Sequence, residues 1–170
     1  MIKIVVIGAA GRMGKTILSC IEDTKGVSIA GGSEYAGHPA IGNDVGETAG
    51  IGTKGIAIVE NIEDAMADCD AVIDFTTPES SINTLSVAVK YEKSLVIGTT
   101  GFSAEQKKSI SHAAKSIRCV FAPNMSIGVN VLFKVAGDVA KIMGDAYDVE
   151  IVEAHHKFKK DAPSGTAVRL

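Results

Sequence analysis

The sequence predicts an α/β fold built on an open parallel sheet. Short β-branched or apolar runs alternate with helix-like segments from residue 2 to residue 121, and this alternation is typical of βαβ units. The chain has 170 residues, of which 46% are hydrophobic. That is ample for one domain with a sizeable core and short for two complete ones.

The first strand, turn and helix occupy the amino terminus. Ile2–Ile7 is a β-branched run, Gly8–Gly14 (GAAGRMG) is a glycine-rich turn, and apolar residues then recur with helical periodicity at Ile17, Leu18 and Ile21. Glycines let a backbone approach a pyrophosphate, which then lies at the positive end of the helix. Since the spacing is G-x-x-G-x-x-G, a simple tight turn remains an alternative.

A second strand over residues 27–30 leads to Glu34, twenty positions after Gly14. At this distance a carboxylate is expected for the hydroxyls of an adenosine ribose. Glu34 alone could be an ordinary surface acid. Together, the strand, glycines, helix, second strand and acid predict a Rossmann-like dinucleotide-binding domain.

The alternation continues after a glycine-rich loop. We expect strands over 56–59, 71–75, 95–97 and 119–121, and helices over 61–67, 79–91 and 103–115, the last with Ser103 and Gln106 as a capping box. Ligands of an open parallel sheet bind beyond the carboxyl ends of its strands. The segments predicted to rim one crevice are therefore Gly8–Gly14, Phe75–Thr77, Gly98–Gly101 and Ala122–Met125, although each alone is only a loop.

The pattern changes near Ser126, so we divide the chain into residues 1–126 and a partial second domain, 127–170. A helix is predicted over 127–143 and a strand over 147–154. The chain then stops inside a helix that should begin near residue 164. One helix and one strand have too few partners to bury their apolar faces, so we expect a truncated domain or a covering chain.

Composition excludes several classes of function. A net charge of −3 and 5% aromatic residues give neither an electrostatic footprint nor a stacking platform for nucleic acid. Cys20, Cys69 and Cys119 lie far apart without C-x-x-C, so we expect buried thiols in a reducing compartment and no disulfide framework or zinc site. No apolar run approaches ~18 residues, so we expect no signal peptide, no membrane span and a cytoplasmic location.

The segment Glu153–Ala167 (EAHHKFKKDAPSGTA) is the richest in chemical groups. It carries His155 and His156, lysines at 157, 159 and 160, and Ser164-Gly165-Thr166 at a helix start. Imidazole titrates near pH ~6.5 and ammonium near ~10.4, so such a site can supply a proton and keep a positive charge. Helix N–H groups suit a carboxylate. The alternatives are a solvated basic loop or a metal site, and we expect no metal because nothing completes a ligand set.

Taken together, these motifs resemble the 4-hydroxy-tetrahydrodipicolinate reductase (dihydrodipicolinate reductase) family. The matching segments are GAAGRMG, Asp74-Phe75-Thr76, VIGTTGF at 96–102, APNMSIGVN at 122–130 and EAHHxxKxDAPSGTA at 153–167. The resemblance implies NAD(P)H-dependent reduction of a small dicarboxylate, 4-hydroxy-tetrahydrodipicolinate, to tetrahydrodipicolinate in diaminopimelate and lysine biosynthesis. It also implies a homo-oligomer, tetrameric at full length, assembled through an α+β substrate and oligomerisation domain that residues 127–170 begin.

The resemblance also implies roles for individual residues. The cofactor contacts would be Gly8, Ala9, Ala10, Gly11, Arg12 and Met13 at the pyrophosphate, Glu34 at the ribose, and Gly98, Thr99, Thr100, Ala122, Pro123, Asn124 and Met125 at the nicotinamide end. The proton donors would be His155 and Lys159, and the partners of the substrate carboxylates Thr100, His156, Lys159, Gly165 and Thr166. The sequence leaves open which of His155 and Lys159 gives the proton.

Two departures from the family pattern affect these expectations. Tyr35 stands where some relatives carry an arginine that pairs with a 2′-phosphate, so NADH is expected to be preferred over NADPH, with Arg12 the nearby cation. The family's chain continues for about a hundred further residues. A non-catalytic dinucleotide-binding module therefore stays open. So does another amino-acid-pathway dehydrogenase of aspartate or homoserine type, which has no reason to carry H-H-x-x-K with S-G-T.

Overall fold

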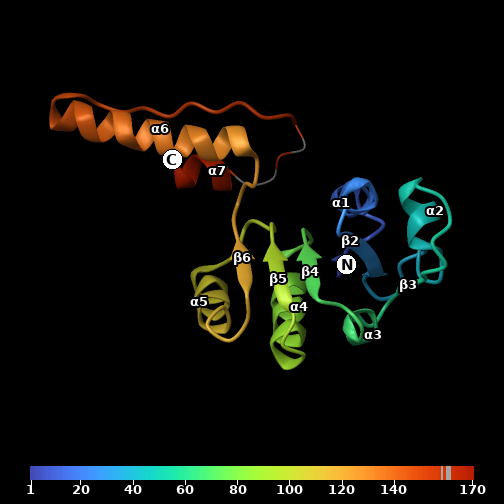
Figure 1. Cartoon of the computed structure of the whole chain (residues 1–170). Coiled ribbons are helices and arrows are strands. Elements are labelled where there is room, and N and C mark those ends of the chain that lie inside the picture. Colours follow the sequence, from blue (N-terminus) through green and yellow to red (C-terminus); the bar gives the residue numbers. More distant parts are fainter. Residues whose placement is uncertain (158, 160–161) are drawn as a thin grey trace. The chain divides into compact units, whose positions relative to one another are not determined.

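A computed structural model describes residues 1–157, 159 and 162–170. The chain divides into two compact units, Met1–Phe121 and Ala122–Leu170. The first unit contains a parallel sheet with helices on its faces, and the second contains one long helix, an extended segment and a short C-terminal helix (Figure 1).

Within residues 1–121, all of which are described, six parallel strands form one sheet in the order β3-β2-β1-β4-β5-β6. The strands are β1 (Ile2–Ile7), β2 (Val27–Ser33), β3 (Ile58–Val59), β4 (Ala71–Asp74), β5 (Ser94–Ile97) and β6 (Cys119–Phe121). The strand order reverses between β1 and β4. In such sheets ligands bind beyond the carboxyl ends of the strands at that point. The predicted Rossmann-like α/β fold is confirmed.

The helices of the first unit are α1 (Arg12–Asp23), α2 (Val45–Ala49), α3 (Ile62–Met66), α4 (Pro78–Lys90) and α5 (Ala104–Ala113). The predicted capping box at α5 is present: Ser103 accepts the Gln106 N–H while the Gln106 side chain accepts the Ser103 N–H. The sequence analysis missed α2, which lies in the expected glycine-rich loop. Five residues are too few for helical periodicity to stand out.

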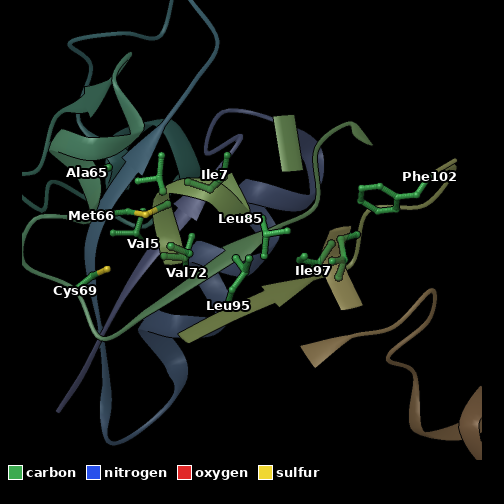
Figure 2. Packing of buried hydrophobic residues seen from close by; sticks show 13 residues of the cluster. Val5, Ile7, Ala65, Met66, Cys69, Val72, Leu85, Leu95, Ile97 and Phe102 are labelled. Atoms are coloured by element: carbon green, nitrogen blue, oxygen red, sulfur yellow. The ribbon is translucent and has the colours of Figure 1, made fainter. Parts of the chain in front are cut away.

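The core is divided between the two faces of the sheet. Val5 and Ile7 of β1 pack with side chains of β4, β5, α3, α4 and α5, as Figure 2 shows. Ile4 and Val6 point to the other face and pack with α1, α2 and β3. Successive strand residues alternate between faces, so β1 is covered on both sides. The strand that leads into the glycine turn is therefore held firmly by packing on both faces.

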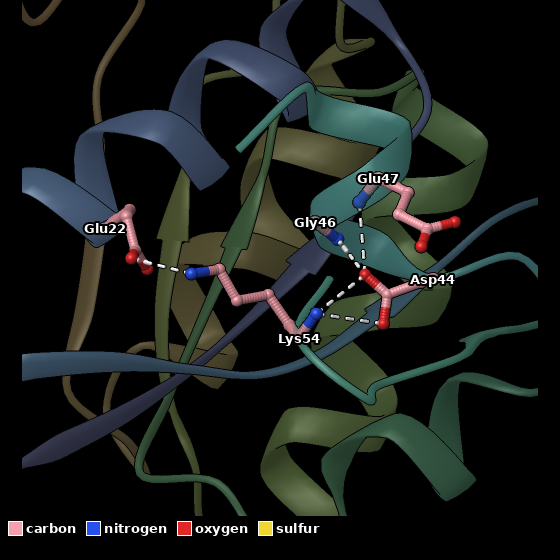
Figure 3. Close-up of polar contacts among 5 residues, drawn as sticks. All are labelled: Glu22, Asp44, Gly46, Glu47 and Lys54. Carbon is pink, nitrogen blue, oxygen red and sulfur yellow. Dashed lines mark hydrogen bonds and ion pairs between the residues drawn. The ribbon is translucent and has the colours of Figure 1, made fainter. Parts of the chain in front are cut away.

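The segment around α2 is tied together by one carboxylate. Asp44 accepts N–H groups from Gly46, Glu47 and Lys54 at 2.8 to 3.1 Å (Figure 3), and the Lys54 ammonium pairs with Glu22 of α1 at 2.6 Å. Partial burial would raise the pKa of Asp44, but these N–H donors and that of Ile56 lower it to about 2. The loop is thus anchored both to itself and to α1.

In the second unit, α6 (Ile127–Met143) has the predicted bounds and is followed by a 3₁₀ turn, η1 (Gly144–Ala146), and by α7 (Gly165–Arg169). The predicted strand over 147–154 is wrong, because these residues form neither helix nor strand. A strand needs a hydrogen-bonded neighbour. The described part of the second unit contains no other strand to pair with it.

The prediction of three buried cysteines is wrong for Cys20. Cys69 is buried and Cys119 is half-buried, but Cys20 is exposed on α1, where the inward positions are taken by Leu18 and Ile21. Across the described residues, no helix has the length and apolar character needed to cross a membrane.

Candidate cofactor and substrate sites

The glycine turn joins β1 to α1 by close backbone packing. The N–H groups of Gly8 and Ala9 donate to the Ser33 carbonyl at 2.9 and 3.1 Å, and Gly8 has a positive φ of 70°. A Cβ at Gly14 would lie only 2.0 Å from the Gly8 carbonyl oxygen. A side chain at position 14 would therefore push the helix away from the strand.

The helix that follows begins without a side-chain cap. Gly11 is the N-cap of α1, and no side chain accepts the first N–H groups of the helix. The first four N–H groups of a helix lack partners inside it, and the helix dipole favours negative charge there. The turn and the start of α1 can therefore hold a pyrophosphate.

Glu34 lies beside this turn. Its Oε1 accepts the Ala10 N–H at 2.9 Å, and its own N–H donates to the Val59 carbonyl at 3.0 Å. Tyr35 is exposed and contacts the His38 ring edge-on, with centroids 4.9 Å apart. The structure therefore brings the predicted ribose carboxylate next to the predicted pyrophosphate turn.

A cavity of about 760 Å³ opens at this end of the sheet. Gly8, Gly11 and Glu34 line it, as do Phe75–Thr77. Two further glutamates in its lining, Glu60 and Glu63, were missed by the sequence analysis. They come one and four residues after β3, so the rule used for the other strand ends could have found them.

A buried polar network fixes the ends of β4 and β5. Asp74 is fully buried, and its Oδ1 accepts the Thr76 N–H at 2.9 Å and the Thr76 hydroxyl at 2.6 Å. Thr99 accepts from the Thr76 N–H at 2.9 Å and from the Ser81 hydroxyl at 2.8 Å. A Cβ at Gly98 would lie 2.0 Å from a Phe75 ring carbon. The predicted segments 75–77 and 98–101 are thus locked together.

Of the four predicted rim segments, 8–14 and 75–77 contribute residues to the cavity lining, and 98–101 adjoin the latter. Arg12 and Met13 are exposed at the start of α1. Ala122–Met125 belong to the second unit.

A second cluster gathers the polar residues of the second unit. Asn124 donates to the Thr166 hydroxyl at 3.2 Å. The Glu153 carboxylate accepts the N–H and hydroxyl of Ser164 at 2.8 and 2.5 Å, and lies 3.5 Å from Nδ1 of His155. Ser164 in turn caps α7 by accepting the Ala167 N–H. The predicted helix start at 164–166 is confirmed.

Glu153 carries a lowered pKa. The hydroxyl and N–H of Ser164 contribute most to this shift, and the positive charges of His155 and Lys159 add to it. Glu153 therefore stays an anion beside the predicted proton donors. Sequence reasoning did not assign Glu153 any role, although this residue begins the motif. Lys160, expected in the same basic loop, lies outside the described residues.

The family model described as dihydrodipicolinate reductase, N-terminus, matches residues 2–125, and the model for the C-terminus of the same enzyme matches residues 128–170. The chain belongs to the dihydrodipicolinate reductase family. The resemblance read from the motifs is confirmed. The roles assigned to individual residues stay predictions.

Curated members of this family cover the whole chain. The 4-hydroxy-tetrahydrodipicolinate reductase of Geotalea uraniireducens is 54% identical over 170 residues, and that of Hahella chejuensis is 49% identical over the same length. In both cases the match covers 100% of this chain and 64% of the relative. The chain thus spans just under two thirds of the length of these reductases.

Solved structures agree with the fold. The dipicolinate-bound dihydrodipicolinate reductase from Paenisporosarcina sp. TG-14 has a TM-score of 0.73 and 30% identity, over 99% of this chain and 63% of that one. The amine dehydrogenase from Mycobacterium smegmatis has a TM-score of 0.58 at 20% identity, over 71% of this chain and 38% of that one. The second likeness concerns the fold alone.

Proposed function

We propose that the full-length protein containing this chain is a 4-hydroxy-tetrahydrodipicolinate reductase of diaminopimelate and lysine biosynthesis. Residues 1–126 would bind the nicotinamide dinucleotide, and residues 127–170 would begin the substrate domain. The observation that carries the proposal is the cavity in which the glycine turn, the start of α1 and Glu34 meet. Family membership supplies the substrate class.

In this proposal the cofactor is held from both ends. Residues 8–13 bind the pyrophosphate, Glu34 binds the ribose hydroxyls, and residues 98–100 and 122–125 hold the nicotinamide end. The Asp74 network supports the last assignment, because it leaves the ends of β4 and β5 little freedom to shift. A bound NADH supplies the hydride.

In this proposal the second unit supplies the proton, and the substrate contacts come from the second unit and from Thr100 of the first. His155 and Lys159 are the candidate acids, and a positioned acid typically contributes about 10²–10⁴ to rate. Glu153 orients the His155 ring through Nδ1. Lys159, His156, Thr100 and the residues Gly165 and Thr166 would hold the two carboxylates. The full-length protein would be a homo-oligomer.

NADH should be the preferred cofactor. A carboxylate that accepts ribose hydroxyls contributes roughly 1.5–3 kcal/mol, and the same carboxylate repels a 2′-phosphate. The affinity for NADH should therefore be at least about tenfold higher than the affinity for NADPH. The chain has no Trp, so NADH emission can be read directly in a titration. A clear NADPH preference would contradict this assignment of Glu34.

Turnover can be tested in a chimera that adds the remaining residues of the Geotalea uraniireducens reductase after Leu170. The expected result is NADH oxidation with the dihydrodipicolinate-type substrate, no NADH oxidation with aspartate semialdehyde and no NAD⁺ reduction with homoserine. Binding of NADH by the chain without turnover by the chimera would favour a non-catalytic dinucleotide-binding module instead.

A further inference from the structure

The register between β2 and β3 brings a second carboxylate to the ribose end of the cavity. Gly32 pairs with Ile58 and Ser33 pairs with Val59. Glu34 and Glu60 are the next residues on the two strands, and the Glu34 N–H still donates to the Val59 carbonyl at 3.0 Å. Neighbouring strands lie about 4.8 Å apart. The two glutamates therefore leave the sheet side by side, and both line the cavity.

A backbone contact holds Glu60 in this place. Its Oε2 accepts the Gly37 N–H at 3.3 Å, and the positive φ of Gly37, 75°, lets the chain after Tyr35 turn toward it. The loop that carries Tyr35 is thus hydrogen-bonded to the residue that follows β3. Glu60 belongs to the same wall of the cavity as the predicted ribose ligand.

The three glutamates on this wall differ in whether a cation is paired with the carboxylate. Glu63 accepts from the Lys90 ammonium at 2.9 Å and from the Tyr91 hydroxyl at 2.7 Å, so a cation offsets its charge. Glu34 and Glu60 accept uncharged backbone N–H groups. Within the fully described residues 1–121, the cavity lining includes no lysine, arginine or histidine.

We propose that Glu60 is a second specificity-determining residue, which acts with Glu34 to favour NADH by repelling the 2′-phosphate of NADPH. The inference rests on the proposed function, because it requires the adenosine ribose to lie at Glu34. A 2′-phosphate would bring about −1.5 to −2 charges to two adjacent carboxylates. A 2′-hydroxyl brings none, so NADH meets no such repulsion.

The test is fluorescence titration of the chain with NADH and with NADPH, at low ionic strength. Glu60→Gln should raise NADPH affinity by about three- to tenfold, the effect of one carboxylate acting partly through solvent, and should change NADH affinity less than twofold. Glu60→Lys should raise NADPH affinity further, by about tenfold or more, because attraction replaces repulsion. Both gains should shrink in high salt.

Glu105→Gln is the matched control, since it removes the same charge from an exposed position on α5, outside the cavity lining. It should leave both affinities unchanged. Glu34→Gln should raise the affinity for NADPH and lower the affinity for NADH. The loss of NADH affinity distinguishes Glu34, which binds the ribose, from Glu60, which only repels the phosphate. Competition by adenosine 2′,5′-bisphosphate and by 5′-AMP repeats the comparison without a nicotinamide.

An unchanged ratio of NADPH to NADH affinity in both Glu60 variants would overturn the role of Glu60. Equal gains for both cofactors would overturn it too, since these indicate general electrostatics or altered loop structure. If wild-type chain binds NADH and only the ratio fails to respond, the proposed function survives. If it binds neither dinucleotide, the proposed function and this inference fall together.

Discussion

The two units differ in how completely they bury their own apolar surface. In the first, Val5 and Val6 of β1 are fully buried on opposite faces of one strand. In the second, α6 has no buried residue, and Ile127 and Ile142 are 84% and 83% exposed. A helix with a broad apolar face normally buries that face against a partner. The apolar residues of the first unit are therefore covered within that unit, whereas those of α6 remain exposed.

The largest expected effect concerns the second unit, whose apolar residues are the more exposed. In the chimera described above, Lys159→Ala should lower turnover by about 10²–10⁴, the range for a lost acid or positioning group, with NADH affinity nearly unchanged. Single-turnover rates measure this. Lys157→Ala and Lys160→Ala remove the same charge from the same segment and should have small effects. Equal behaviour of all three variants would indicate a solvated basic loop.

Shortening an apolar side chain should destabilise the protein more in the first unit than in the second. Leu18→Ala removes a fully buried side chain and should lower the free energy of unfolding by about 2–5 kcal/mol. Leu132→Ala on α6 removes the same atoms from a half-exposed site and should cost less than about 1 kcal/mol. Urea denaturation measures both. Similar losses of unfolding free energy for the two variants would mean that Leu132 is buried to the same extent as Leu18.

The hydrogen bonds accepted by Asp44 make the stability of the first unit depend on pH. Its pKa is about 2 in the folded chain, below the unfolded value of about 3.9. The stabilisation is therefore fully present above pH ~4 and is lost as pH falls toward 2. Asp44→Asn should lower stability near neutral pH and flatten the change between pH ~4 and 2. Denaturation at several pH values tests this, and identical pH profiles would exclude the anchor.

The smallest effect is expected in association. The exposed apolar residues of α6 should make the chain self-associate, because such patches recruit other chains. Light scattering should show species above monomer mass, and Val135→Glu should shift the population toward monomer. Val135 is 52% exposed, so this change should leave the fold intact. A wild-type monomer that binds no apolar dye would contradict the expectation.

Sequence reasoning succeeded where one local signal determined the structure. The periodicity of residues 127–143 gave the bounds of α6, and the spacing from Gly14 to Glu34 correctly predicted a carboxylate beside the turn. It failed where the outcome depends on distant partners. The extended residues 147–154 have strand-like composition but no neighbour to pair with. The position of Glu60 at a strand end could be inferred locally, but its place beside Glu34 follows from the register of β2 with β3, which no local pattern encodes.

The central position of β1 also matters while the protein is being made. This strand leaves the ribosome well before its neighbour β4, since the Lys3 N–H donates to an Asp70 carboxylate 67 residues further along. At about 5–20 residues per second, several seconds pass before that side of β1 can be covered. During this time a run of apolar, β-branched residues is exposed to other nascent chains. Productive folding thus depends on keeping this one strand from pairing elsewhere until β4 emerges.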